Sequence, residues 1–120
     1  MDSSADFIEF LYGQIAAASE VRYRKMFGEY CLYCNDKVIG LVCDNQFFLK
    51  PTESGRRVLE KPLEVPPFEG AKNWFLIEDL DNAEFLTSLV YQTWLELPEV
   101  KQKAKLKKRK AKTDDLNKMR

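Results

Sequence analysis

Histidine is absent from the 120 residues of this chain. Its absence excludes the Ser-His-Asp and Cys-His types of catalysis, histidine-ligated metal sites and the commonest general base in enzymes. Carboxylate, lysine or tyrosine chemistry remains open, but no pattern in the sequence points to it. We therefore assign no catalytic residue, no metal ligand and no cofactor.

Cysteine is scarce, and long apolar runs are missing. The three cysteines cannot all pair within one chain, which favours a reducing compartment. The opening Met1-Asp2-Ser3-Ser4 has neither the basic nor the apolar part of a signal peptide. No apolar stretch approaches the roughly 18 residues that span a bilayer. We expect a cytoplasmic protein without membrane contact.

Two of the cysteines, Cys31 and Cys34, form a C-x-x-C pattern. This pattern is typical of zinc and redox sites when it lies in a turn. Here it falls within a predicted strand, where residues three apart point to opposite faces of the sheet. We therefore interpret both residues, together with Cys43, as filling the core rather than holding a metal.

The formal net charge of zero conceals a strong asymmetry. Residues 1–98 contain nine Lys and Arg against sixteen Asp and Glu, a net charge of −7. Residues 99–120 contain ten Lys and Arg against three Asp and Glu, a net charge of +7. We predict one acidic domain over 1–98 and a basic tail, helical or partly disordered, over 99–120.

Hydrophobic periodicity predicts an α+β fold. Apolar residues at helical spacing indicate a first helix from Ser4 to Ala18. Four short apolar strands then follow, with Asn35-Asp36 and Asp44-Asn45 as tight turns. The predicted strands are Val21–Phe27, Tyr30–Cys34, Val38–Cys43 and Gln46–Lys50.

The second half of the chain adds two helices and one strand. Thr52 is placed to cap a short helix over residues 53–60, and the proline-rich stretch after it is predicted to be irregular up to Gly70. A fifth strand covers residues 73–78. A helix capped by Asp81, with Glu84 three residues later, ends at Leu97-Pro98. The expected fold is an N-terminal helix, an antiparallel sheet of about five strands (a four-stranded meander plus one later strand), a C-terminal helix packed on the sheet, and the basic tail.

Several blocks of this sequence resemble one known family. The stretch Arg-Lys-Met-Phe-Gly-Glu-Tyr-Cys-Leu-Tyr-Cys at residues 24–34 is similar to the opening signature of the TfoX/Sxy N-terminal domain. The order of the later blocks is similar as well: Phe48-Leu49-Lys50-Pro51, Pro66-Pro67-Phe68-Glu69-Gly70, and Leu95-Glu96-Leu97-Pro98. The resemblance covers roughly residues 5–98. One departure is Cys31, where the family usually has a smaller residue.

The resemblance implies an antiparallel sheet packed on helices and a regulatory, non-enzymatic role. Competence regulators of this family help to activate transcription of DNA-uptake genes together with the cyclic AMP receptor protein. Their full-length members carry a second helical domain, where this chain has its basic tail. The resemblance therefore implies a protein partner, with transcription machinery as the expected class.

The tail has the strongest charge signal in the sequence. A cationic run without apolar anchors suits phosphate contact through counterion release, with little sequence preference. A solvated end that only aids solubility explains the same run. The candidate contact residues are Lys101, Lys103, Lys105, Lys107, Lys108, Arg109, Lys110 and Lys112, with Arg22, Arg24 and Lys25 as a second basic cluster.

Three interpretations stay open at the level of sequence. The first is a regulatory or adaptor domain that binds a protein partner. The second is a nonspecific DNA- or RNA-binding protein that acts through its tail. The third is a small enzyme or ligand-binding domain that uses carboxylates or thiols. Exposed sheet edges would also allow two copies to pair as a homodimer.

Overall fold

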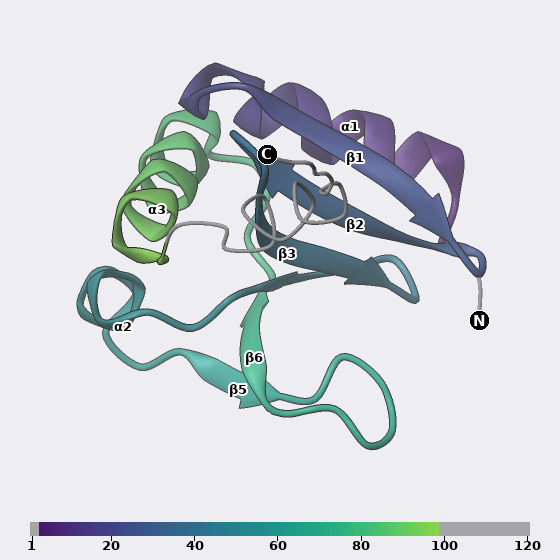
Figure 1. Cartoon of the computed structure of the whole chain (residues 1–120). Helices are drawn as coiled ribbons and strands as arrows, with labels where there is room; N and C mark the ends of the chain where they lie inside the picture. The colour runs from purple at the N-terminus through teal and green to yellow at the C-terminus, as the bar shows by residue number, and fades with distance from the viewer. Residues whose placement is uncertain (1–2, 99–120) are drawn as a thin grey trace, which may run out of the picture.

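A computed structural model of the chain describes residues 3–98, so the predicted basic tail lies outside the described residues. Figure 1 shows the arrangement of its elements. The helices are α1 (Ala5–Ile15), the 3-10 turn η1 (Ala16–Ala18), α2 (Glu53–Leu59) and α3 (Ala83–Glu96). The strands are β1 (Val21–Met26), β2 (Glu29–Cys34), β3 (Lys37–Cys43), β4 (Gln46–Leu49), β5 (Leu63–Val65) and β6 (Trp74–Ile77).

Within the described part of the chain, all six strands form one antiparallel sheet in the order β1-β2-β3-β4-β6-β5. The predicted α+β class and the four-stranded meander are confirmed. The prediction of about five strands was one short, because β5 lies in the stretch that we expected to be irregular. The strand Leu63–Val65 pairs with β6 although its own sequence, Leu-Glu-Val between prolines, is too short for a periodic signal.

Two-residue turns connect the strands of the meander. Asn35, Asp36, Asp44 and Asn45 all have positive φ, as the expected turns between β2 and β3 and between β3 and β4 require. Phe27 also has a positive φ, of 52°, beside Gly28 at 82°. It therefore belongs to the turn, and our assignment of it to the first strand was wrong.

The helix ends follow local capping chemistry. Ser4 caps α1 by accepting from the Phe7 N–H, and Thr52 caps α2 as predicted by accepting from the Gly55 N–H. Asn82 rather than Asp81 caps α3, since its side-chain oxygen accepts from the Phe85 N–H. The helical hydrogen bonding thus starts one residue later than predicted.

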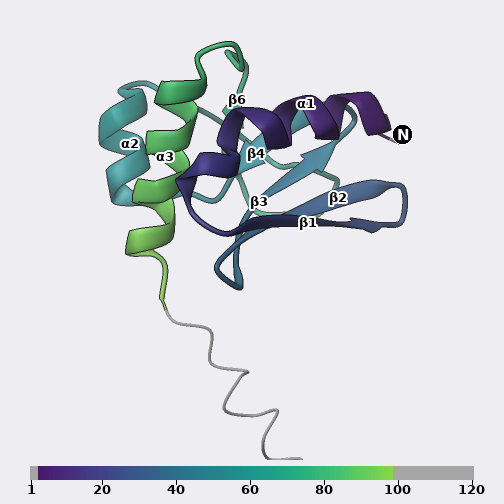
Figure 2. The same ribbon diagram turned by 90° about the horizontal axis from the view of Figure 1, so that it is seen from above.

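The core lies between one face of the sheet and the helices. Figure 2 shows α1 and α3 on the same side of the strands. The fully buried side chains include Ile8 and Leu11 of α1, Phe47 of β4, Phe75 of β6 and Leu89 of α3. No described helix covers the other side of β1–β4, which we call the open face.

Lys37 binds the C-terminal end of α3. Its Nζ donates to the backbone oxygens of Trp94 at 3.1 Å and Leu97 at 2.7 Å, and it lies 5.4 Å from the centre of the Trp94 ring. A cation at this position satisfies carbonyls that the helix end leaves without a partner. None of the described helices is both long enough and apolar enough to span a membrane.

Candidate functional site

The turn between β1 and β2 presents an aromatic side chain to solvent. Phe27 is 98% exposed, and its neighbour Met26 is 44% exposed. A bulky residue with positive φ is a rare conformation, and an aromatic ring in water loses the benefit of burial. The strained backbone and the exposed ring both lower the stability of the domain. Such a residue is typical of a functional site. The Met-Phe-Gly stretch of the family signature is thus a surface feature.

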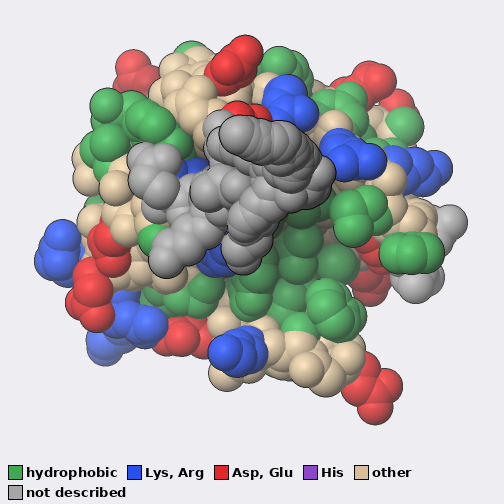
Figure 3. Space-filling model, in the orientation of Figure 1, with side chains coloured by type: hydrophobic (Ala, Val, Ile, Leu, Met, Phe, Trp, Pro, Cys, Tyr) green, Lys and Arg blue, Asp and Glu red, His purple; other side chains and the backbone are tan. Residues whose placement is uncertain are grey.

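An apolar hollow lies beside this turn on the open face. It has a volume of about 580 Å³, within the roughly 300–1,000 Å³ that is usual for binding pockets. Strands β2 and β3 supply its floor, and the segment between β5 and β6 supplies its far wall. The lining residues are Met26, Phe27, Glu29, Tyr30, Cys31, Leu41, Cys43, Asp44, Pro67 and Phe68. Figure 3 shows hydrophobic side chains gathered around the hollow, with Lys and Arg side chains beside it.

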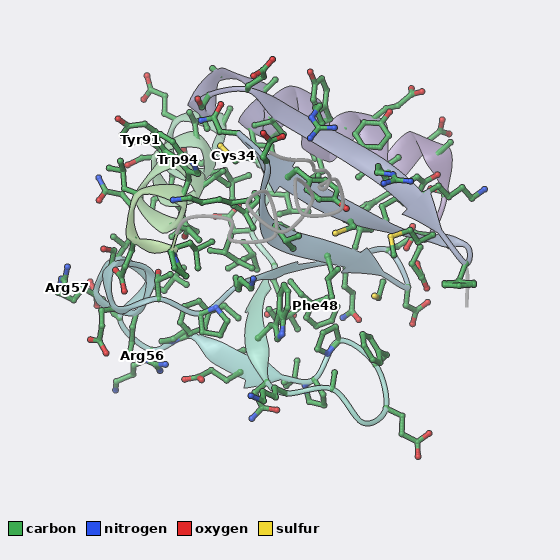
Figure 4. All side chains as sticks on the ribbon, viewed as in Figure 1. Cys34, Phe48, Arg56, Arg57, Tyr91 and Trp94 are labelled. Carbon is green, nitrogen blue, oxygen red and sulfur yellow. The ribbon has the colours of Figure 1, made fainter. Side chains whose placement is uncertain are left out.

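Strand register explains why apolar side chains continue across the open face. Cys31 pairs with Leu41, Leu41 with Phe48, and Phe48 with Leu76, so these four side chains form one row across four strands. Phe48 lies where β4 meets β6 (Figure 4). Phe68, in the segment after β5, is 58% exposed at the rim of the hollow. The open face therefore has an apolar centre where a solvated sheet would alternate toward polar residues.

A hydrogen-bond network holds the exposed turn in place. The Glu29 carboxylate accepts from the Ser3 hydroxyl at 2.6 Å and from the Asp44 N–H at 3.2 Å. The Ser3 hydroxyl oxygen in turn accepts from the Asn45 N–H at 2.9 Å, and the Ser3 N–H donates to the Gly28 carbonyl. These bonds join the start of the chain to both turns at this end of the sheet. Phe27 is consequently exposed on a turn that hydrogen bonds hold in one conformation.

The hollow has opposite charges at its two ends. Lys50 follows β4 at the end away from Asp44, Arg24 pairs with Cys31 across β1 and β2, and the positive charges of both act on the Cys31 thiol. At the other end, the negative charges of Glu29 and Asp44 act on the Cys43 thiol. The surface is therefore polar along its length, with a cationic end, an apolar centre and an anionic end.

Burial determines the state of the thiols. It raises the pKa of the Cys31, Cys34 and Cys43 thiols above their ordinary value of 9.0, and for Cys31 the hydrogen bond with Tyr33 and the two cations only reduce this rise. All three are therefore protonated thiols at neutral pH, the unreactive form.

This burial predicts a loss of stability in alkali. The folded protein keeps thiol protons that the unfolded chain releases, so the stabilisation is complete below the unfolded pKa of 9.0 and disappears as pH rises through the higher folded values. Urea unfolding under reducing conditions, from neutral pH to about pH 10, should show this decline. The Cys34→Ala variant, although less stable at neutral pH, should show a shallower decline. If the free energy of unfolding declines equally with pH in both proteins, the decline does not come from the Cys34 thiol.

The C-x-x-C pair is separated as predicted. Cys34 belongs to the core cluster and lies toward α3 (Figure 4). Cys31 instead lines the hollow on the open face. The three cysteines are free thiols. Among the described residues, no group of three or more Cys, Asp or Glu side chains is arranged to hold a metal ion.

The second basic cluster is divided between two sides of β1. Arg22 and Arg24 point to the open face, where Arg22 forms an ion pair with Asp36 at 3.0 Å and lies 5.3 Å from the centre of the Tyr33 ring. Lys25 alternates to the other side of the strand. The eight cations of the tail lie outside the described residues, so their contact role stays a prediction.

Sequence reasoning missed the exposed Phe27 and the hollow. The signal for the turn was present, because Phe27-Gly28 separates two alternating strands by two residues. The hollow had no local signal. Pro67 and Phe68 are more than twenty residues from the nearest other lining residue, and only the β4–β6 pairing brings them close.

Comparison with known proteins agrees with this architecture. The family model described as TfoX N-terminal domain matches residues 13–96. An uncharacterized 12.7 kDa protein from the trpE 5′ region of Spirochaeta aurantia is 38% identical over 109 residues, which cover 89% of this chain and 95% of that protein. The family-model match includes the exposed turn, the strands of the hollow and α3. This chain belongs to the TfoX N-terminal domain family.

Proposed function

We propose that this chain is a non-enzymatic regulatory or adaptor domain that acts by binding a protein partner through its open face. The observation that carries the proposal is Phe27, which is 98% exposed in a positive-φ turn at the rim of an apolar hollow. Large aromatic side chains beside a well-formed apolar pocket are typical anchors of protein interfaces. The cavity presents protonated thiols and no histidine, which supports recognition rather than catalysis.

Family membership supports the regulatory part of this proposal. We propose a cytoplasmic protein that acts on transcription, with the regulation of DNA uptake as the process that the family resemblance suggests. The partner would then belong to the transcription machinery.

A matched pair of variants tests the role of the open face. Phe27→Ser removes the anchor, while Phe10→Ser makes the same change at a 46% exposed side chain on α1, away from the hollow. Transcripts would be compared in a strain that lacks the gene and carries wild type, either variant or residues 1–98. We expect wild type and Phe10→Ser to restore the transcripts that the deletion changes, and Phe27→Ser to fail, with equal melting temperatures for both variants. A deletion without any effect on transcripts, or full rescue by Phe27→Ser, would contradict the proposal.

The charge of residues 99–120 favours a second candidate, nonspecific binding of DNA or RNA. The strain with residues 1–98 distinguishes the two. If the tail is the active part, that truncation fails while Phe27→Ser rescues. Anisotropy of labelled duplex DNA would then show binding by the full chain only, with a steep dependence on salt.

A further inference from the structure

The proposed contact surface has the features of one that recognises itself. A protruding Phe27 stands directly beside an apolar hollow, so the same patch carries a projection and a cavity. In a two-fold interface, each patch meets an identical patch, and residue i contacts residue j in both directions. A neighbouring projection and cavity satisfy this requirement, because each copy can insert its projection into the cavity of the other.

The charges of the patch support the same arrangement. Arg24 pairs with Cys31 and Lys50 follows the far end of β4, whereas Glu29 and Asp44 line the hollow at its other end, beside the turns. A two-fold axis that lies in the interface, perpendicular to the line joining these two ends, reverses that line, so the cationic end of one copy faces the anionic end of the other. Like charges placed opposite each other would oppose binding, whereas this reversal pairs unlike charges.

Other occupants fit the patch less well. Residues 99–120 would bring ten Lys and Arg against Arg22, Arg24 and Lys50, and their sequence offers no continuous apolar face. A strongly acidic peptide would meet Glu29 and Asp44 at one end of the hollow. A small apolar ligand would leave Phe27 exposed at the rim.

We propose that a second copy of this chain occupies the hollow: two copies meet open face to open face about a two-fold axis, and Phe27 of each fills the hollow of the other. This inference rests on the proposed role of the open face as a protein-contact surface and names a second copy as the protein bound there; a partner from the transcription machinery would then contact the dimer through its other surfaces. Phe68 and Met26 then complete the apolar centre, with the paired charges around it. One assembly would carry the cationic tails of both copies, twenty Lys and Arg in place of ten.

Sedimentation of the full chain from micromolar to near-millimolar concentration tests this inference. We expect a concentration-dependent dimer for wild type and for Phe10→Ser. Phe27→Ser should weaken dimerisation about 100-fold or more, because it removes an aromatic anchor from both halves of the interface. Arg24→Glu should weaken it to a smaller extent, since it places a carboxylate opposite the anionic end. A wild-type monomer at every concentration would overturn the inference.

A structural readout separates this dimer from pairing through the edge strands β1 or β5. In a sample that mixes isotope-labelled and unlabelled copies, NMR should show contacts from the Phe27 ring of one copy to Leu41 and Pro67 of the other. A dimer that Phe27→Ser leaves intact, or one without these contacts, means edge pairing and overturns the inference.

The two proposals fail in different ways. A monomeric wild type with loss of rescue by Phe27→Ser would leave the open face as a contact surface for a different protein. If Phe27→Ser disrupts the dimer but still rescues the transcripts fully, the dimer inference stands and the regulatory proposal is wrong.

Discussion

Phe47→Ala is expected to lower the free energy of unfolding by about 3–5 kcal/mol. Phe47 is fully buried on β4, where its register places it between Val42 of β3 and Ile77 of β6. Its ring also packs against the backbone of Gly40, close enough that a Cβ there would lie 2.8 Å from it. The variant leaves a cavity in place of the ring, and the strands on both sides and the Gly40 backbone cannot move easily to fill it. The loss of unfolding free energy should therefore fall at the upper end of this range.

Urea unfolding followed by the fluorescence of Trp74 and Trp94 would measure this loss. The matched control is Phe10→Ala, the same chemical change at a side chain that is 46% exposed on α1. Surface substitutions of this kind usually change stability by less than about 0.5 kcal/mol. Similar losses in the two variants would mean that Phe47 does not fill the centre of the core.

Gly40→Ala is expected to destabilise the domain more than the same change at Gly13 or Gly55. A Cβ at Gly40 would lie 2.7 Å from the Phe48 carbonyl oxygen and 2.8 Å from the Phe47 ring. The carbonyl belongs to the neighbouring strand and cannot move without disturbing the β3–β4 pairing. Overpacking of this kind costs about 1–3 kcal/mol and in rigid surroundings more.

Gly13→Ala is the control for this prediction. Gly13 lies inside α1, and a Cβ there would have no other atom within 4 Å. Alanine should therefore stabilise the helix by about 0.5–1 kcal/mol. Opposite signs for the two Gly→Ala changes are the expected result, measured by the same urea unfolding, and a neutral Gly40→Ala would contradict it.

A double variant distinguishes the two contacts of Gly40. Combining Gly40→Ala with Phe47→Leu removes the ring but leaves the Phe48 carbonyl in place. The two changes should therefore couple, with a double variant more stable than the sum of the single losses predicts. If Phe47→Leu removes the whole destabilisation caused by Gly40→Ala, the clash with the Phe47 ring accounts for it and the clash with the Phe48 carbonyl does not.

Local signals in the sequence determined most of the elements. Apolar spacing predicted α1 and the four strands of the meander, because side-chain direction follows the backbone period directly. Asn35-Asp36 and Asp44-Asn45 predicted their turns, since these residue types tolerate positive φ. The alternation of a strand also predicted that Cys31 and Cys34 face opposite sides. Each of these predictions depends only on neighbours along the chain.

Small competing interactions moved the ends of several elements. Asn82 caps α3 in place of the predicted Asp81. The Asp81 N–H donates instead to the Asp79 carboxylate. The first helix ends at Ile15 and continues as the short turn η1, so its predicted end at Ala18 was too late. Ser3, next to the residue that caps α1, bonds to Glu29. Several side chains could satisfy these groups, and only their final positions select one.

The sequence by itself determined the α+β class, the family and the contrast between an acidic body and a basic tail, since these follow from composition, period and residue order. The tertiary structure alone decided that β5 joins the sheet, that Lys25 is separated from Arg22 and Arg24, and that Phe27 stands beside a hollow. The physical reason is distance along the chain. The hollow joins residues 26–44 with Pro67 and Phe68, and these groups meet only after β4 and β6 have paired.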